Sequence, residues 1–130
     1  MGGAANESIL VVEDEPMVRM LVVDYLNELG YTTIEARDAA AALPVIASSD
    51  PIHLLLTDIG LPGMDGHALA QEARKLRPSL KILFATGYAS AGMGMPVLGE
   101  GMDVVGKPFD MDDLGDRVRT MISGNSANKA

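Results

Sequence analysis

Short apolar runs alternate along this 130-residue chain with longer segments that have helical periodicity. The first run, at 9–12, is Ile-Leu-Val-Val, and 52–57 is another apolar run; residues 31–36, 80–85 and 102–105 also read as strands. Runs of this kind suit parallel strands that are buried on both faces. The alternation therefore predicts a parallel sheet that is covered by helices on both sides.

Helical periodicity is found at 16–29 and 66–76, and a last helix is expected after Asp110, which can cap it. Asp38 is expected to cap an alanine-rich helix that reaches about residue 48. Pro44 falls inside this helix, and an interior proline predicts a kink or an early end.

The 14 glycines fall into turns and one cluster. Gly63 and Gly66 are interpreted as permitting the turn into the helix at 66–76. The segment 87–101 should hold a further helix, but it contains a cluster of glycines and also Pro96. Interior glycine costs about 1 kcal/mol and interior proline about 3 kcal/mol relative to alanine, so this helix is predicted to be short or mobile.

Five strand–helix units in about 115 residues suit a flavodoxin-like, doubly wound (βα)5 sheet in the order 2-1-3-4-5. We expect one domain at 8–123, with small, polar and disordered tails at 1–7 and 124–130. The sequence shows no repeat, no linker and no second domain.

The composition excludes several classes of protein. The chain has 18 acidic and 10 basic residues, a net charge of -8, and such a chain repels the phosphates of nucleic acids. The absence of cysteine excludes a disulfide scaffold, thiolate zinc and a cysteine nucleophile. No apolar run approaches the roughly 18 residues of a membrane helix. With no signal peptide at the N-terminus, the expected location is the cytoplasm.

Polar residues gather where the predicted strands end. Glu13 and Asp14 follow the first strand, Asp58 the third, Thr86 the fourth and Lys107 the fifth. Ligands of such sheets bind beyond the carboxyl ends of the strands. Three carboxylates in one pocket repel one another and favour a cation, and oxygen ligands favour Mg²⁺. A carboxylate beside Mg²⁺ and a lysine fits phosphoryl transfer onto an aspartate.

This arrangement resembles the receiver domain of two-component response regulators over residues 8 to 123. The matching pieces are Glu13-Asp14, Asp58, the run Leu-Pro-Gly-Met-Asp-Gly at 61–66, Thr86 and Lys107-Pro108-Phe109. A single acidic pair is weak evidence, but five elements in the right order at five predicted loops are specific.

The resemblance implies a role for each acidic residue. Asp58 is expected to accept the phosphoryl group, and Asp14 to bind Mg²⁺ directly. Glu13 would act on the metal directly or through water, and the backbone carbonyl of Gly60 would be a further ligand. Asp58 itself would also contact the metal. The protein is then a signalling domain and not an enzyme, apart from the phosphotransfer and dephosphorylation that it catalyses on itself.

The resemblance also implies residues that sense the phosphate. Thr86 would bond the phosphoryl group, Lys107 would pair with Asp58 and then with the phosphoryl oxygens, and Pro108 would follow through a cis bond. The donor would be a phosphohistidine on a sensor histidine kinase or a histidine phosphotransfer protein. The phosphorylated domain, expected to be a monomer, would bind an unknown downstream protein or drain phosphate from a shared kinase.

The sequence departs from the common receiver pattern at its switch position. Many receivers have Tyr or Phe three residues before the lysine, where this chain has Val104. Phe84-Ala85-Thr86-Gly87-Tyr88 resembles a receiver subgroup that has Phe-Ala-Thr-Gly and a following aromatic but lacks the usual switch. Tyr88 is a candidate signal carrier, with plain packing as the alternative. We hypothesise that 87–101 is loosely ordered without phosphate and becomes ordered with it.

Rival functions belong to other classes. An aspartate-based phosphatase would need Asp-x-Asp after the first strand, where this chain has Glu13 and Glu15. A flavin or dinucleotide binder would need a glycine-rich phosphate cradle, where this loop is acidic. The presence of all five site elements argues against a receiver fold that serves only as an interaction module. A receiver cut from a hybrid histidine kinase is the remaining alternative.

Overall fold

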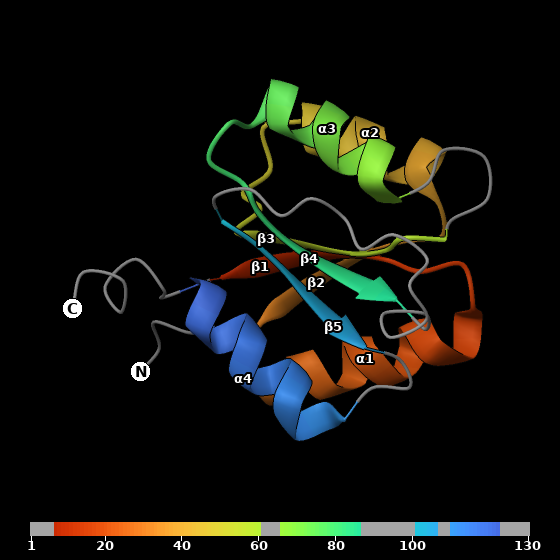
Figure 1. The fold of residues 1–130 in the computed structure, drawn as a ribbon, viewed down its shortest axis with the longest axis vertical. Coiled ribbons are helices and arrows are strands. Elements are labelled where there is room, and N and C mark those ends of the chain that lie inside the picture. The colour runs from red at the N-terminus through yellow and green to blue at the C-terminus, as the bar shows by residue number, and fades with distance from the viewer. Residues whose placement is uncertain (1–6, 61–65, 87–100, 107–109, 123–130) are drawn as a thin grey trace.

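A parallel sheet forms the middle layer of the computed structural model, which describes residues 7–60, 66–86, 101–106 and 110–122. The strands are β1 (Ser8–Val12), β2 (Thr32–Ala36), β3 (Leu54–Asp58), β4 (Lys81–Thr86) and β5 (Met102–Gly106). The helices are α1 (Pro16–Glu28), α2 (Ala39–Ala47), α3 (Gly66–Leu76) and α4 (Met111–Ile122). In Figure 1, α2 and α3 cover one face of the sheet and α1 and α4 the other.

The strand order is β2-β1-β3-β4-β5 and all neighbours are parallel, which confirms the predicted flavodoxin-like sheet. In the register, Val12 lies beside Thr57, and Asp58 lies beside Ala85. The carboxyl ends of β1, β3 and β4 are therefore level with one another. This alignment brings the residues that follow these strands to one edge.

The period-two pattern of β1 separates two apolar cores. Leu10 and Val12 pack with residues of α2 and α3, whereas Ile9 and Val11 pack with residues of α1 and α4. All four side chains are almost completely buried. A strand that is buried on both faces has no polar face, which explains the continuous apolar run in the sequence.

Helix α2 begins directly after its predicted capping residue. The side chain of Asp38 accepts a hydrogen bond from the amide of Ala41 at the start of α2. This helix continues through Pro44 to Ala47, so it does not end early at the proline. Packing of Ala39, Ala42 and Ile46 in the core supports a helix that has lost one backbone hydrogen bond. The helix expected at 87–101 lies outside the described residues.

Cationic side chains bind helix carbonyl groups at the amino-end edge of the sheet, opposite Asp58. Arg77 donates to the carbonyl oxygens of Ile46 and Ser48, each at 2.8 Å, at the end of α2. Lys81 donates to the carbonyl of Met121 at 3.0 Å, near the end of α4. These contacts satisfy carbonyl groups that lack a partner within their helices and place positive charge at the negative ends of the helix dipoles.

In the part of the chain that the structure describes, every helix is too short or too polar to cross a membrane.

Candidate functional site

Three carboxylates meet at the carboxyl edge of the sheet. Glu13 and Asp14 follow β1, and Asp58 is the last residue of the neighbouring strand β3. Each offers an oxygen atom within 4.8 Å of those of the other two. Glu13 is buried, Asp58 is half-buried and Asp14 is exposed, so the cluster opens to solvent on one side. The structure thus brings together the three acids that the sequence placed in one pocket.

Glu13 is held by several hydrogen bonds. Its amide donates to the carbonyl of Ala36 in β2 at 3.1 Å, and its Oε2 accepts from the amide of Glu15 at 3.0 Å. Its carbonyl accepts from Nη1 of Arg19 at 2.7 Å. Only 4% of the residue is exposed. The buried carboxylate therefore has a fixed position at the base of the cluster.

Asp58 is positioned by its own loop. Its Oδ1 accepts a hydrogen bond from the amide of Gly60 at 3.1 Å, and its carbonyl accepts one from the hydroxyl of Thr57 at 3.1 Å. Gly66 donates its amide to Ile59 at 2.8 Å and lies against the Asp58 backbone. Gly66 thus does more than permit a turn: a Cβ atom there would collide with the Asp58 carbonyl. The φ of Gly66 is not positive, so glycine is required here by the close approach of the Asp58 backbone and not by the backbone conformation.

The donor set of the cluster consists of carboxylate oxygens. Three such groups at this spacing repel one another, and a bound cation relieves that repulsion. Mg²⁺ prefers hard oxygen ligands and binds through one or two carboxylates together with water and phosphate. The residues present therefore fit Mg²⁺ better than a metal that selects thiolate or imidazole.

The sequence model of the response regulator receiver domain family matches residues 9–119 of this chain. The chain belongs to this family. Receiver domains are signalling domains. The family match agrees with the resemblance found in the motifs at the strand ends, and the observed fold agrees with the predicted one.

Known relatives of this receiver domain include a receiver protein and a kinase. The response regulator receiver protein CpdR of Brucella abortus is 36% identical over 116 residues, which cover 88% of this chain and 95% of CpdR. The sensor histidine kinase RcsC of Salmonella typhi is 39% identical over 107 residues, which cover 82% of this chain. Those residues span only 11% of the kinase.

Solved structures show the same fold. The response regulator TrrA of Thermotoga maritima, solved in complex with Mg²⁺ and BeF, has a TM-score of 0.78 and 32% identity. The alignment covers 89% of this chain and 99% of that one.

The remaining predicted residues of the receiver domain divide between described and undescribed segments. Thr86 is the last residue of β4, paired with Gly106 and one position beyond the neighbour of Asp58. Val104 lies in β5 and packs against the core on the α2–α3 side. Lys107, Pro108 and Tyr88 lie outside the described residues.

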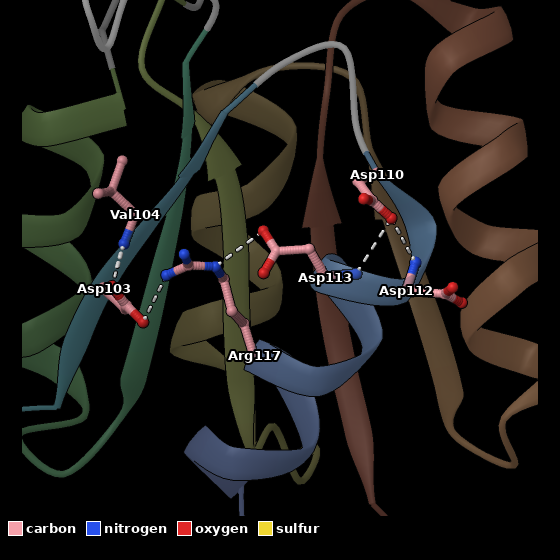
Figure 2. A network of polar contacts seen from close by, with 6 residues as sticks. All are labelled: Asp103, Val104, Asp110, Asp112, Asp113 and Arg117. Carbon is pink, nitrogen blue, oxygen red and sulfur yellow. Dashed lines mark hydrogen bonds and ion pairs between the residues drawn. The ribbon is translucent and has the colours of Figure 1, made fainter.

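A polar network joins β5 to α4 in the receiver domain (Figure 2). Arg117 donates to Asp103 at 3.1 Å and to Asp113 at 3.0 Å, and the other Asp103 oxygen accepts the amide of Val104 at 2.8 Å. Hydrogen bonding to Asp113, with the charge of Asp103, raises the pKa of Arg117 against the opposing effect of burial. The i,i+4 spacing of Asp113 and Arg117 is a sequence signal for their ion pair, whereas nothing in the sequence points to the contact with Asp103.

Proposed function

We propose that this receiver domain accepts a phosphoryl group on Asp58 in a Mg²⁺-dependent reaction. The observation that carries the proposal is the cluster of Glu13, Asp14 and Asp58, whose oxygens lie within 4.8 Å of one another. These carboxylates and the backbone carbonyl of Gly60 would hold Mg²⁺. The metal would neutralise charge on the transferred phosphoryl oxygens.

The resemblance to receiver domains makes Asp58 the acceptor and the more exposed Asp14 a metal ligand, and burial argues against Glu13 as the acceptor. Glu13 is buried and bonded to its own loop, whereas Asp58 is partly exposed at the end of a central strand. A carboxylate oxygen of Asp58 attacks phosphorus, and the bond from phosphorus to the donor histidine nitrogen breaks. The imidazole keeps the electron pair of that bond, and the product is an acyl phosphate on Asp58.

Thr86 and Lys107 are proposed to bind the transferred group. Thr86 ends the strand beside β3, so it is close in the sheet to Asp58. A hydroxyl and an ammonium group would each bond a phosphoryl oxygen and so report its arrival. Val104 and Tyr88, with Pro108, are the residues through which a changed conformation would be transmitted.

The exposed face of α1 suits the protein that donates the phosphoryl group. Met17, Met20 and Leu21 lie at i, i+3 and i+4 spacing and are 65%, 53% and 53% exposed. The helix starts directly after the loop that carries Glu13 and Asp14. A protein that brings phosphohistidine to Asp58 must cover the acidic cluster and the start of α1 beside it. We therefore assign the face to a histidine kinase or phosphotransfer protein.

The output of the receiver domain is proposed to be a change in partner binding or removal of phosphate from a shared kinase. The similarity to CpdR, a receiver protein covered over 95% of its length, favours a separate regulator, and the similarity to RcsC favours a receiver that works within a kinase. For a separate regulator, a monomer in the cytoplasm is the proposed working form.

Beryllofluoride, which mimics a phosphoryl group on aspartate, tests the proposal. Amide signals of Asp14, Asp58 and Thr86 should shift in NMR spectra when beryllofluoride and Mg²⁺ are added together, and not with beryllofluoride alone. The Asp58→Asn variant is the control. Unchanged signals in the wild-type protein would reject phosphoacceptance and favour a receiver fold that serves only as an interaction module.

A further inference from the structure

We propose that Arg19 is a positioning residue that sets the affinity of the acidic cluster for Mg²⁺ by fixing the Glu13–Asp14 peptide group. The inference rests on the proposed function, because it concerns the metal that the cluster would hold. It adds a residue of α1 to a site that the motifs placed only at the strand ends.

The contacts of Arg19 join three parts of the fold. Its Nη1 donates to the carbonyl of Glu13 at 2.7 Å, and its Nε donates to Oε1 of Glu35 in β2 at 3.1 Å. Its own amide donates to Glu15 at 2.9 Å in the first turn of α1. One guanidinium group thus connects the helix, the acidic loop and the neighbouring strand.

The peptide group that Arg19 holds links two of the three carboxylates. Its carbonyl belongs to Glu13 and its amide to Asp14, so rotation of this group would redirect both side chains. The preceding peptide is already fixed, because the Glu13 amide donates to Ala36. Arg19 supplies the matching restraint on the other side of Glu13.

The burial of Arg19 and Glu35 indicates which contact of Arg19 restrains the acidic loop, the ion pair with Glu35 or the hydrogen bond to Glu13. The Arg19 side chain is 19% exposed and that of Glu35 is 53% exposed. An ion pair with an exposed glutamate contributes little by itself. The hydrogen bond to the Glu13 carbonyl lies deeper, and Arg19 can make both because its guanidinium presents donors in a rigid fork.

Charge and position have opposite effects on metal binding, so they can be separated. A guanidinium near the cluster repels Mg²⁺, and its removal would tighten binding if charge alone mattered. Loss of a positioning contact weakens binding instead. Groups that orient metal ligands typically change the affinity by about 10- to 100-fold.

The test measures Mg²⁺ affinity by calorimetry in the wild type and in Arg19→Gln, Arg19→Lys and Glu35→Gln. We expect Arg19→Gln to bind about tenfold more weakly. Arg19→Lys should recover part of the loss, and Glu35→Gln should remain close to the wild type. In the metal-free protein, hydrogen exchange of the Glu15 amide, which bonds to Glu13, should be faster in Arg19→Gln. Urea unfolding establishes that each variant is folded.

Equal or tighter Mg²⁺ binding by a folded Arg19→Gln variant would overturn the inference while leaving the proposed function intact. Equal losses in Arg19→Gln and Glu35→Gln would also overturn it, because the ion pair would then be the cause. Failure of the wild-type protein to bind Mg²⁺ would reject the proposed function and this inference with it.

Discussion

Gly66 lies directly against the carbonyl group of Asp58. A Cβ atom at residue 66 would collide with the carbonyl oxygen and come within 2.9 Å of the carbonyl carbon. Both atoms belong to backbone that cannot move without displacing Asp58. We expect Gly66→Ala to lower the free energy of unfolding by about 1–3 kcal/mol, as overpacking does. Urea unfolding measures this loss, and acetyl phosphate as donor should phosphorylate the variant more slowly.

Gly60→Ala is the matched control for that substitution. A Cβ atom at residue 60 would have Oδ1 of Asp58 as its nearest neighbour, at 4.0 Å, which is ordinary contact. The amide that bonds to Asp58 and the carbonyl proposed for Mg²⁺ are both retained. If Gly60→Ala lost as much stability as Gly66→Ala, the contact of Gly66 with the Asp58 carbonyl could not be the cause of the loss.

Substitution of Asp58 by Asn should abolish phosphorylation while keeping the fold. The amide oxygen of Asn can still accept the hydrogen bond from Gly60, but it is a poor nucleophile. Removing one of three neighbouring carboxylates also relieves repulsion, so the metal-free variant should be more stable than the wild type. Intact-protein mass spectrometry after incubation with a phosphodonor measures the first effect. An added phosphate on Asp58→Asn, at the wild-type rate, would show that another residue is the acceptor.

Leu21→Ala should impair phosphotransfer from a protein donor. Leu21 is 53% exposed on the face of α1 that we assign to the donor, so its truncation removes contact area. Phosphorylation by acetyl phosphate should be unchanged, because a small donor does not need this face. Leu76→Ala is the matched control: Leu76 is 51% exposed at the end of α3, away from the acidic cluster. Equal effects of both substitutions would remove the α1 face from the proposal.

Gly115→Ala should destabilise the protein although alanine is the better helix former by about 1 kcal/mol. Gly115 lies in α4, and a Cβ atom there would be 2.6 Å from the hydroxyl of Tyr25 and 3.2 Å from Cδ1 of Leu29. The substitution therefore requires the side chain of Tyr25 or the packing of α1 against α4 to shift. Tyr25→Phe removes the nearest atom, so the double variant should recover part of the loss. A double-mutant cycle by urea unfolding measures this coupling, and additive effects would contradict the contact.

Alkaline pH should destabilise the protein through Tyr31. Burial, together with the charge of Glu7, raises the pKa of Tyr31 against a smaller opposing effect of Arg119. Above about pH 10, the unfolded chain loses the phenol proton that the folded protein keeps. The contribution of Tyr31 to stability is present below that pH and is lost as pH rises through the folded pKa. Tyr31→Phe should show a smaller decline in urea unfolding between pH 9 and 11; identical curves would exclude this role.

The sequence was sufficient to predict the sheet and the acidic cluster. Parallel strands end at a common edge, so Glu13, Asp14 and Asp58 could be placed together from the positions of their strands alone. The contact of Arg19 with the Glu13 carbonyl could not be predicted in this way, because it depends on how α1 crosses the loop. The pair of Arg117 with Asp103 likewise depends on the placement of α4 beside β5.

β5 is an edge strand of the sheet, and its polar network limits what can pair with it. An unpaired amide on such a strand offers a hydrogen bond to another chain, and so invites edge-to-edge aggregation. At Val104 this amide is taken by the carboxylate of Asp103, which Arg117 holds in place. The same three residues therefore place a charged pair where a second strand would have to approach. The charged pair at this edge thus opposes pairing of β5 with the same strand of a second copy.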